Sequence, residues 1–288
     1  MSLIEKLSFR RAYEPGAVES ALRDRQRGPA LAPGQKILVL ACDHPARGAL
    51  GAGSDPLAMA SREEVLRRCQ QIMAHPGVGG FLGTADLVED LALLGSLEGK
   101  YVWGSMNRGG LAGASFEMDD RFTGYDAQGV AEAGLDGGKM LLRVNYEDAG
   151  SARTIEHCAR AVTELGRLQL NAMVEPFISR WQDGQIVNDL SPDAVIKSIA
   201  IAQGLGPSTA HTWLKLPAVD EMDRVMEATT LPSLILGGAV SQDVEGTYKR
   251  WQETLQLPNV VGLVIGRSLL FPPDGDVDGA VNRLVEML

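Results

Sequence analysis

Residues 212–265 contain the pattern that decides the fold: the short runs TWLKLP (212–217), SLIL (233–236) and VVGLVI (260–265), separated by longer amphipathic stretches. The runs are mostly apolar along their whole length, as in strands that are buried on both faces of a parallel sheet. The same alternation extends back to residue 37. The predicted strands are Ile37–Ala41, Val78–Leu82, Tyr101–Gly104, Gly138–Leu142, Ala172–Glu175, Thr212–Leu216, Ser233–Leu236 and Val260–Ile265.

The stretches between the runs show helical spacing of apolar residues. Strand followed by helix, eight times, is typical of a closed parallel barrel, whereas a doubly wound sheet has a Gly-rich turn after its first strand in place of CDHPARG (42–48). We therefore predict a single-domain (β/α)8 TIM barrel over residues 36–288. The predicted helices are Arg62–Met73, Ala85–Leu94, Asp126–Ala133, Ala152–Leu168, Pro192–Gln203, Asp220–Ala228, Gln242–Thr254 and Val277–Met287.

Residues 1–35 precede the repeat and predict an N-terminal extension: a polar helix, Ala17–Arg27, and a linker across the bottom of the barrel. The formal net charge of −10 disfavours nucleic acid and anionic membranes as partners. No run has the pattern of a signal peptide or the length of a membrane span. The three cysteines are widely spaced and form no CxxC pair. These features predict a cytoplasmic protein with reduced thiols.

Ionisable residues occur near the carboxyl ends of four predicted strands, where barrel enzymes carry their reactive groups: Asp43, Lys139, Glu175 and Lys215. Buried charges of this kind must pair with one another or take part in chemistry. A lysine beside another cation in a dry site has a lowered pKa and can act as a neutral nucleophile. The set fits a buried ion-pair cluster that ties strands together, and it fits a Schiff-base site centred on Lys215. We favour the second interpretation.

Glycine turns follow the seventh and eighth strands, in LGGAV (236–240) and VIGRSLLF (264–271). Such turns let backbone N–H groups approach an anion, and these two positions form the common phosphate site of barrel enzymes. A tight turn without a ligand is the alternative for a Gly-Gly pair. The candidate phosphate- or substrate-binding residues are Gly237, Gly238, Gly266, Arg267, Arg143 and Arg108.

Weaker signals lie in the loops. His44 and His211 lack the spacing of a metal motif, so no metal is expected. Arg47 and Asn107 follow the first and third strands and either contact substrate or are solvated. Trp181, in RWQDGQIVND (180–189), fits either a hairpin lid over the site or a packing anchor.

In their order along the chain, these motifs resemble those of the class I aldolase superfamily that contains the archaeal-type fructose-bisphosphate and the class I tagatose-bisphosphate aldolases. The resemblance rests on ACDHPARG, GGKMLLRVNY, VEPF, WLKLP, LGGAV and VIGRSLLF. It implies that Lys215 forms the Schiff base, with Asp43, Lys139 and Glu175 beside it. The nearest branch carries DHPARG and is associated with inositol and sugar-acid breakdown. The loop after the first strand and the segment around Trp181 depart from the tagatose type.

The sequence therefore predicts a metal-independent aldehyde-lyase, without a cofactor, that cleaves a C–C bond of a phosphorylated ketose or keto-sugar acid. Glu175 or Asp43 would carry protons, and Lys139 would hold a substrate group and lower the pKa of Lys215. Two alternatives use the same scaffold: a phosphosugar isomerase or epimerase with Glu175 as base, and a non-catalytic phosphosugar-binding barrel. The expected partner is the phosphorylated sugar, and a homo-oligomer is expected by analogy with related barrels.

Overall fold

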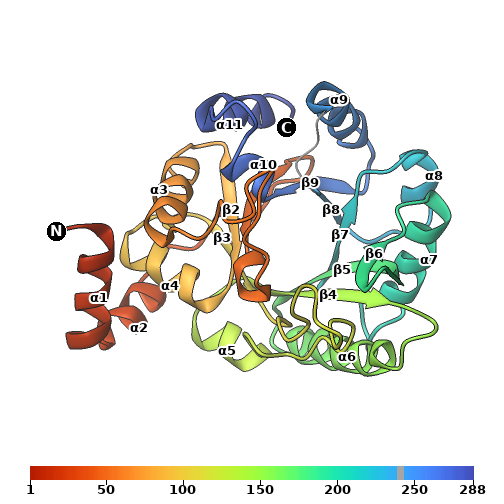
Figure 1. Cartoon of the computed structure of the whole chain (residues 1–288), viewed down its shortest axis with the longest axis horizontal. Coiled ribbons are helices and arrows are strands. Elements are labelled where there is room, and N and C mark those ends of the chain that lie inside the picture. The colour runs from red at the N-terminus through yellow and green to blue at the C-terminus, as the bar shows by residue number, and fades with distance from the viewer. Residues whose placement is uncertain (239–242) are drawn as a thin grey trace.

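The computed structural model describes residues 1–238 and 243–288, and its centre is a ring of eight parallel strands surrounded by helices (Figure 1). Around the ring the order is β4-β3-β2-β1-β9-β8-β7-β5, and pairing of β4 with β5 closes it. The predicted (β/α)8 barrel is confirmed. The barrel strands are β1 (Ile37–Cys42), β2 (Val78–Gly83), β3 (Tyr101–Ser105), β4 (Gly137–Val144), β5 (Asn171–Gln182), β7 (Thr212–Pro217), β8 (Ser233–Leu236) and β9 (Val260–Ile265).

The helices cover the outside of the barrel, and several of them begin at a residue whose side chain caps the first turn. For example, the Ser191 side chain accepts a hydrogen bond from the backbone N–H of Ala194, and Pro192 occupies the first turn. The predicted helix start at Gln242 lies outside the described residues, and the short α10 was not predicted. The helices after β1 are α3 (Arg62–Met73), α4 (Ala85–Leu93), α5 (Ala127–Glu132), α6 (Gly150–Arg167), α7 (Pro192–Gln203), α8 (Met222–Met226), α9 (Val244–Thr254), α10 (Arg267–Leu270) and α11 (Val277–Val285).

The N-terminal extension forms two helices, α1 (Leu3–Tyr13) and α2 (Gly16–Arg23), where the sequence predicted one over residues 17–27. A capping box between Ser2 and Glu5 starts α1 and was overlooked. The guanidinium group of Arg25 is buried and donates hydrogen bonds to the backbone carbonyls of Leu97, Lys100 and Gly134. These contacts attach the extension beside the amino ends of β3 and β4.

The direction of alternate side chains along β1 explains how the barrel positions its polar residues. Ile37, Val39 and Ala41 pack in the apolar cluster inside the barrel, whereas Leu38, Leu40 and Cys42 pack outward against the helices. The inner series continues into Asp43, beyond the last residue of the strand. The strands therefore bring alternate side chains to the carboxyl end of the barrel interior.

The three cysteines, Cys42, Cys69 and Cys158, are buried and free of disulfide bonds. Within residues 1–238 and 243–288, none of the helices has the length and apolar character needed to span a bilayer.

Candidate active site

The four charged residues singled out in the strands meet at the carboxyl end of the barrel interior. The Nζ atom of Lys139 lies 3.2 Å from Oδ2 of Asp43 and 2.5 Å from Oε2 of Glu175. The Nζ atom of Lys215 lies 3.1 Å from Oε1 of Glu175. All four residues are buried, with Lys139 only 2% and Lys215 only 4% exposed. The residues form a continuous, buried series of contacts between alternating positive and negative charges.

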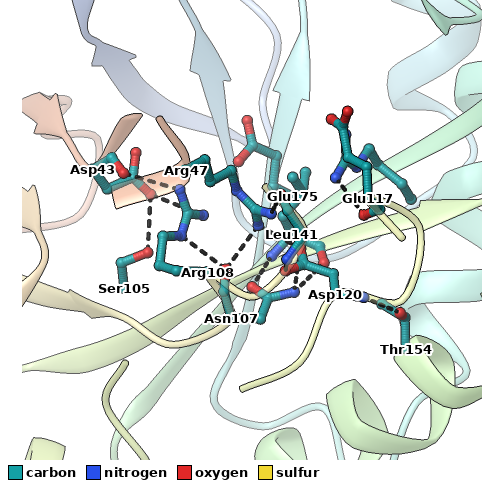
Figure 2. A network of polar contacts seen from close by, with 12 residues as sticks. Asp43, Arg47, Ser105, Asn107, Arg108, Glu117, Asp120, Leu141, Thr154 and Glu175 are labelled. Carbon is teal, nitrogen blue, oxygen red and sulfur yellow. Dashed lines mark hydrogen bonds and ion pairs between the residues drawn. The ribbon is translucent and has the colours of Figure 1, made fainter. Parts of the chain in front are cut away.

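Asp43 stands at one end of this chain, against β3 and the loop that follows it. Its carboxylate accepts a hydrogen bond from the Ser105 hydroxyl at 3.0 Å and lies 3.1 Å from a guanidinium nitrogen of Arg108 (Figure 2). Burial alone would raise the pKa of Asp43, but Arg108 and then Lys139 hold that pKa well below its usual range. Asp43 is therefore an ionised carboxylate.

Lys139 and Glu175 have shifted pKa values as well. Burial lowers the pKa of Lys139 to about 8, against the opposing effect of the carboxylates of Asp43 and Glu175. Burial would raise the pKa of Glu175, but Lys139 and Lys215 bring it down to about 2. A lysine with a pKa of about 8 exchanges its proton readily near neutral pH, and the Glu175 carboxylate beside it stays ionised.

A cavity of about 690 Å³ opens above the charged chain. Its floor carries the four ionisable residues. Its walls come from the loops after β1, β3, β7, β8 and β9, from α9 and from the hairpin after β5. The sequence-predicted residues that line it are Asp43, Arg108, Lys139, Arg143, Glu175, Lys215, Gly237, Gly238, Gly266 and Arg267. The barrel thus brings the predicted catalytic and phosphate-binding residues into one chamber.

The glycine turns lie on the wall formed by β8 and β9. Gly238 has a φ of +67°, which favours glycine. A Cβ atom on Gly266 would lie 2.9 Å from the carbonyl oxygen of Ala41 and 3.0 Å from Cε1 of His44, so a side chain does not fit there. Arg267 follows directly, and its buried Nε atom has no hydrogen-bond partner among the residues that the structure describes. This wall offers an anion an unoccupied donor.

The three candidate arginines differ in how they are paired. Arg108 is held by Asp43, and Arg143 forms an ion pair with Glu117 and donates a 3.0 Å hydrogen bond to the carbonyl of Glu117. In the part of the chain that the structure describes, no carboxylate forms an ion pair with Arg267. Arg267 is therefore the arginine whose charge is available to a substrate.

The histidines considered for a metal site lie at opposite ends of the barrel. His44 follows the carboxyl end of β1, whereas His211 precedes the amino end of β7. Across residues 1–238 and 243–288, no group of three His, Cys, Asp or Glu side chains is arranged to hold a metal ion. Burial holds the pKa of His44 at about 3, so its imidazole is neutral.

The segment around Trp181 forms a hairpin, as one of the two interpretations expected. β5 extends to Gln182 and pairs in antiparallel fashion with β6 (Gln185–Asn188), which lines the cavity. The indole N–H of Trp181 donates a hydrogen bond of 2.6 Å to Oδ2 of Asp148 in the loop after β4. Trp181 therefore anchors the hairpin, and β6 forms a wall of the cavity.

For several polar residues beside the site, the sequence did not predict burial. Glu117 and Asp120 lie in the loop after β3 and are buried, and Arg47 and Asn107, for which solvation was an alternative, are buried with them. The segment SFEMDDRF (115–122) has the composition of an exposed loop. Only the three-dimensional contacts identify its carboxylates as partners of one arginine in the loop after β1 and one in β4.

Comparison with known proteins relates the fold of this chain to that of other barrels. The crystal structure of Cgl0159 from Corynebacterium glutamicum has 50% sequence identity and a TM-score of 0.96, covering 99% of this chain and 96% of that one. An archaeal fructose 1,6-bisphosphate aldolase has 17% identity and a TM-score of 0.64, covering 94% and 98%. An archaeal fructose-1,6-bisphosphate aldolase with its catalytic lysine bound to the carbinolamine intermediate has 17% identity and a TM-score of 0.63, again covering 94% and 98%.

At 17% identity, the two aldolase structures show that this chain shares their fold. The resemblance expected from the sequence is confirmed at the level of the fold. A search of curated proteins gives no match. The family model described as Cgl0159-like matches residues 35–285. The chain therefore belongs to the Cgl0159-like family.

Proposed function

We propose that this protein is a class I aldolase that forms a Schiff base through Lys215. The observation that carries the proposal is the buried chain Arg108–Asp43–Lys139–Glu175–Lys215, in which three cations face two carboxylates. A net charge in a buried site is costly, so the chain favours release of one lysine proton. A neutral lysine at the floor of a cavity is what attack on a carbonyl requires.

The contacts of the two lysines favour Lys215 as the nucleophile. The Nζ atom of Lys139 is held between two carboxylates, at 2.5 and 3.2 Å, whereas that of Lys215 contacts one carboxylate, at 3.1 Å. Freeing Lys139 for attack would break two ion pairs, and freeing Lys215 breaks one. Lys139 is better suited to pass protons, because its pKa of about 8 lies close to neutral pH.

The proposed reaction begins when the Lys215 amine attacks the substrate ketone and forms a C–N bond. Loss of water from the carbinolamine gives an iminium ion, and Glu175, in contact with both lysines, is placed to move the protons. Asp43 or Glu175 then takes the proton of the substrate hydroxyl as the C–C bond breaks. The bonding electrons move into the iminium group, an aldehyde leaves, and the enamine is protonated and hydrolysed to release the second product.

The substrate class follows from the cavity wall. Arg267 and the turns at Gly237, Gly238 and Gly266 suit a phosphate group at one end of the substrate. A phosphate bound there would direct the rest of the substrate into the cavity that Lys215 also lines, and fixing the carbonyl carbon near Lys215 is what cleavage needs. Archaeal fructose-1,6-bisphosphate aldolases with this fold, one of them solved as a lysine carbinolamine, support the same chemistry. We propose a phosphorylated ketose or keto-sugar acid as substrate.

We propose a cytoplasmic location, which suits three buried free cysteines. The iminium group is the electron sink of the reaction, so the chemistry does not call for a cofactor.

The test is inactivation by borohydride. The protein is incubated with dihydroxyacetone phosphate or with pyruvate, reduced, and assayed for aldol cleavage of phosphorylated ketoses. Substrate-dependent, irreversible loss of activity supports the proposal. Interconversion of a phosphosugar without a covalent adduct would instead identify an isomerase, and binding without turnover would identify a phosphosugar-binding protein.

A further inference from the structure

The loop between β3 and α5 (residues 106–126) contains buried charges although it forms neither a helix nor a long strand. Asn107 is completely buried and Asp120 is 2% exposed. Loops with buried charges are rare, because each charge needs a partner. The partners lie in the loop after β1, in β4 and in α6, and Figure 2 shows a network that reaches from Thr154 to Asp43.

Asp120 is the centre of this network. Its carboxylate forms an ion pair with Arg47, accepts a hydrogen bond from the side-chain amide of Asn107 at 3.0 Å, and accepts another from the backbone N–H of Gly110 at 2.9 Å. Arg47 lies in the loop after β1, four residues beyond Asp43. The ion pair therefore fastens the loop after β1 to the loop after β3.

Arg47 and Arg108 meet at one acceptor, the backbone carbonyl of Asn107. A terminal nitrogen of Arg47 donates to this oxygen at 2.7 Å, and Nε of Arg108 donates to it at 2.8 Å. The other end of the Arg108 guanidinium group holds Asp43, with contacts of 3.1 Å to its carbonyl and to its carboxylate. A continuous series of contacts thus runs from Asp120 to Asp43.

We propose that the buried Arg47–Asp120 ion pair is a positioning device that holds Arg108 against Asp43 and so keeps the Asp43 carboxylate correctly oriented in the active site. Arg47 and Asp120 are positioning residues, because each acts through the Asn107 carbonyl and Arg108. The carboxylate of Asp120 also balances one of two buried guanidinium groups, those of Arg47 and Arg108, which come from different loops and meet at the Asn107 carbonyl. This inference rests on the proposed function for its kinetic consequences, and its structural part does not depend on catalysis.

The expected effect is a change in the titration of Asp43. The charged or titratable groups that face Asp43 are Arg108, Lys139, His44, Lys215, Glu175 and Arg267. Arg108 lowers the pKa of Asp43 more than any of the other cations. If Arg108 moves away, the pKa of Asp43 rises, and the acid limb of the activity profile moves to higher pH.

The first experiment compares Asp120→Asn with wild type. We expect kcat to fall about 10- to 100-fold and the acid limb to move up by about one pH unit. The matched control is Asp119→Asn, because Asp119 pairs with Arg121 and Arg153 at the surface. Unchanged pH dependence in Asp120→Asn would overturn the proposal.

A double-mutant cycle separates positioning from general loss of structure. If Asp120 acts through Arg108, Asp120→Asn added to Arg108→Met lowers kcat no further than Arg108→Met alone. Losses that multiply in the double variant would contradict the proposal. If Asp120→Asn does not fold, Arg47→Lys serves in its place, since it keeps the charge but cannot reach all the acceptors of Arg47. A wild-type pH profile in folded Arg47→Lys would also overturn the proposal.

A measurement without turnover distinguishes failure of this inference from failure of the proposed function. Aspartate labelled with 13C at its side-chain carboxyl gives a signal for Asp43 that is assigned by its loss in Asp43→Asn. This signal should titrate at higher pH in Asp120→Asn and at the wild-type pH in Asp119→Asn. That result would support the positioning role even if no aldol reaction were found, and identical titration in both variants would reject it.

Discussion

The Glu175 carboxylate is shared by two lysines, with Oε1 lying 3.1 Å from Nζ of Lys215 and Oε2 lying 2.5 Å from Nζ of Lys139. Neither lysine has this carboxylate to itself, and Lys139 has a second carboxylate in Asp43. When one lysine loses its proton, the electrostatic attraction between Glu175 and the other, charged lysine therefore increases. The shared carboxylate couples the protonation of the two amines electrostatically. Its removal is therefore expected to affect both stability and activity.

Glu175→Gln is expected to destabilise the protein by about 3–5 kcal/mol at pH 7, because it breaks the buried contacts of the Glu175 carboxylate with Lys139 and Lys215. The pKa of Glu175 is about 2, below the ordinary 4.5, so its contribution is present above pH 4.5 and is lost as the pH falls from 4.5 to 2. Urea denaturation across this range measures the difference, with surface Glu156→Gln as control. A difference that stays constant down to pH 2 would contradict the assignment.

His44 is expected to make the protein sensitive to acid. Its pKa in the folded protein is about 3, below the ordinary 6.5, so the unfolded chain binds a proton that the folded chain does not. Stability is therefore lost as the pH falls from 6.5 to 3. Folded His44→Gln should lose less stability than wild type over that range, as measured by chemical denaturation at several pH values. Equal dependence of stability on pH in the two proteins would show that His44 is not responsible.

Arg267→Gln is expected to raise KM for a phosphorylated substrate about 10- to 100-fold, with a smaller effect on kcat, because hydrogen bonds to a charged group contribute about 1.5–3 kcal/mol. Binding of inorganic phosphate, followed by calorimetry, should weaken in parallel. Arg283→Gln on the surface of α11 is the control. If KM changes equally for phosphorylated and unphosphorylated substrates, the phosphate does not bind at Arg267.

Chelation of metals is expected to leave turnover unchanged, because the iminium group itself accepts the electrons of the breaking bond. The activity is measured before and after dialysis against EDTA. Loss of activity that added zinc restores would point to a metal-dependent enzyme.

The strands of the barrel, and the charged residues they carry, could be predicted because burial on both faces gives an unmistakable run of apolar residues. A charge within such a run, as at Lys139 or Lys215, is conspicuous. Its direction follows from alternation along the strand: Trp213 faces the barrel interior, and Lys215, two residues later, shares that side. The convergence of side chains from four strands therefore follows from local rules and the closure of the barrel.

The contacts of the loops could not be predicted in this way. Asp119 and Asp120 are adjacent and chemically identical, yet one pairs with exposed arginines and the other is buried against Arg47. No periodic pattern distinguishes them, because the loop after β3 takes its shape from contacts with other loops. The same reason explains why Arg143, expected near the substrate, has its charge balanced by Glu117.

The most direct test of the central claim locates the covalent adduct. Wild-type protein, Lys215→Met and Lys139→Met are each reduced with borohydride in the presence of dihydroxyacetone phosphate and, separately, pyruvate, then digested for mass spectrometry. We predict an adduct on Lys215 in wild type and in folded Lys139→Met, and none in folded Lys215→Met. An adduct that remains in Lys215→Met, or that maps to Lys139 in wild type, would contradict the assignment of Lys215 as the nucleophile.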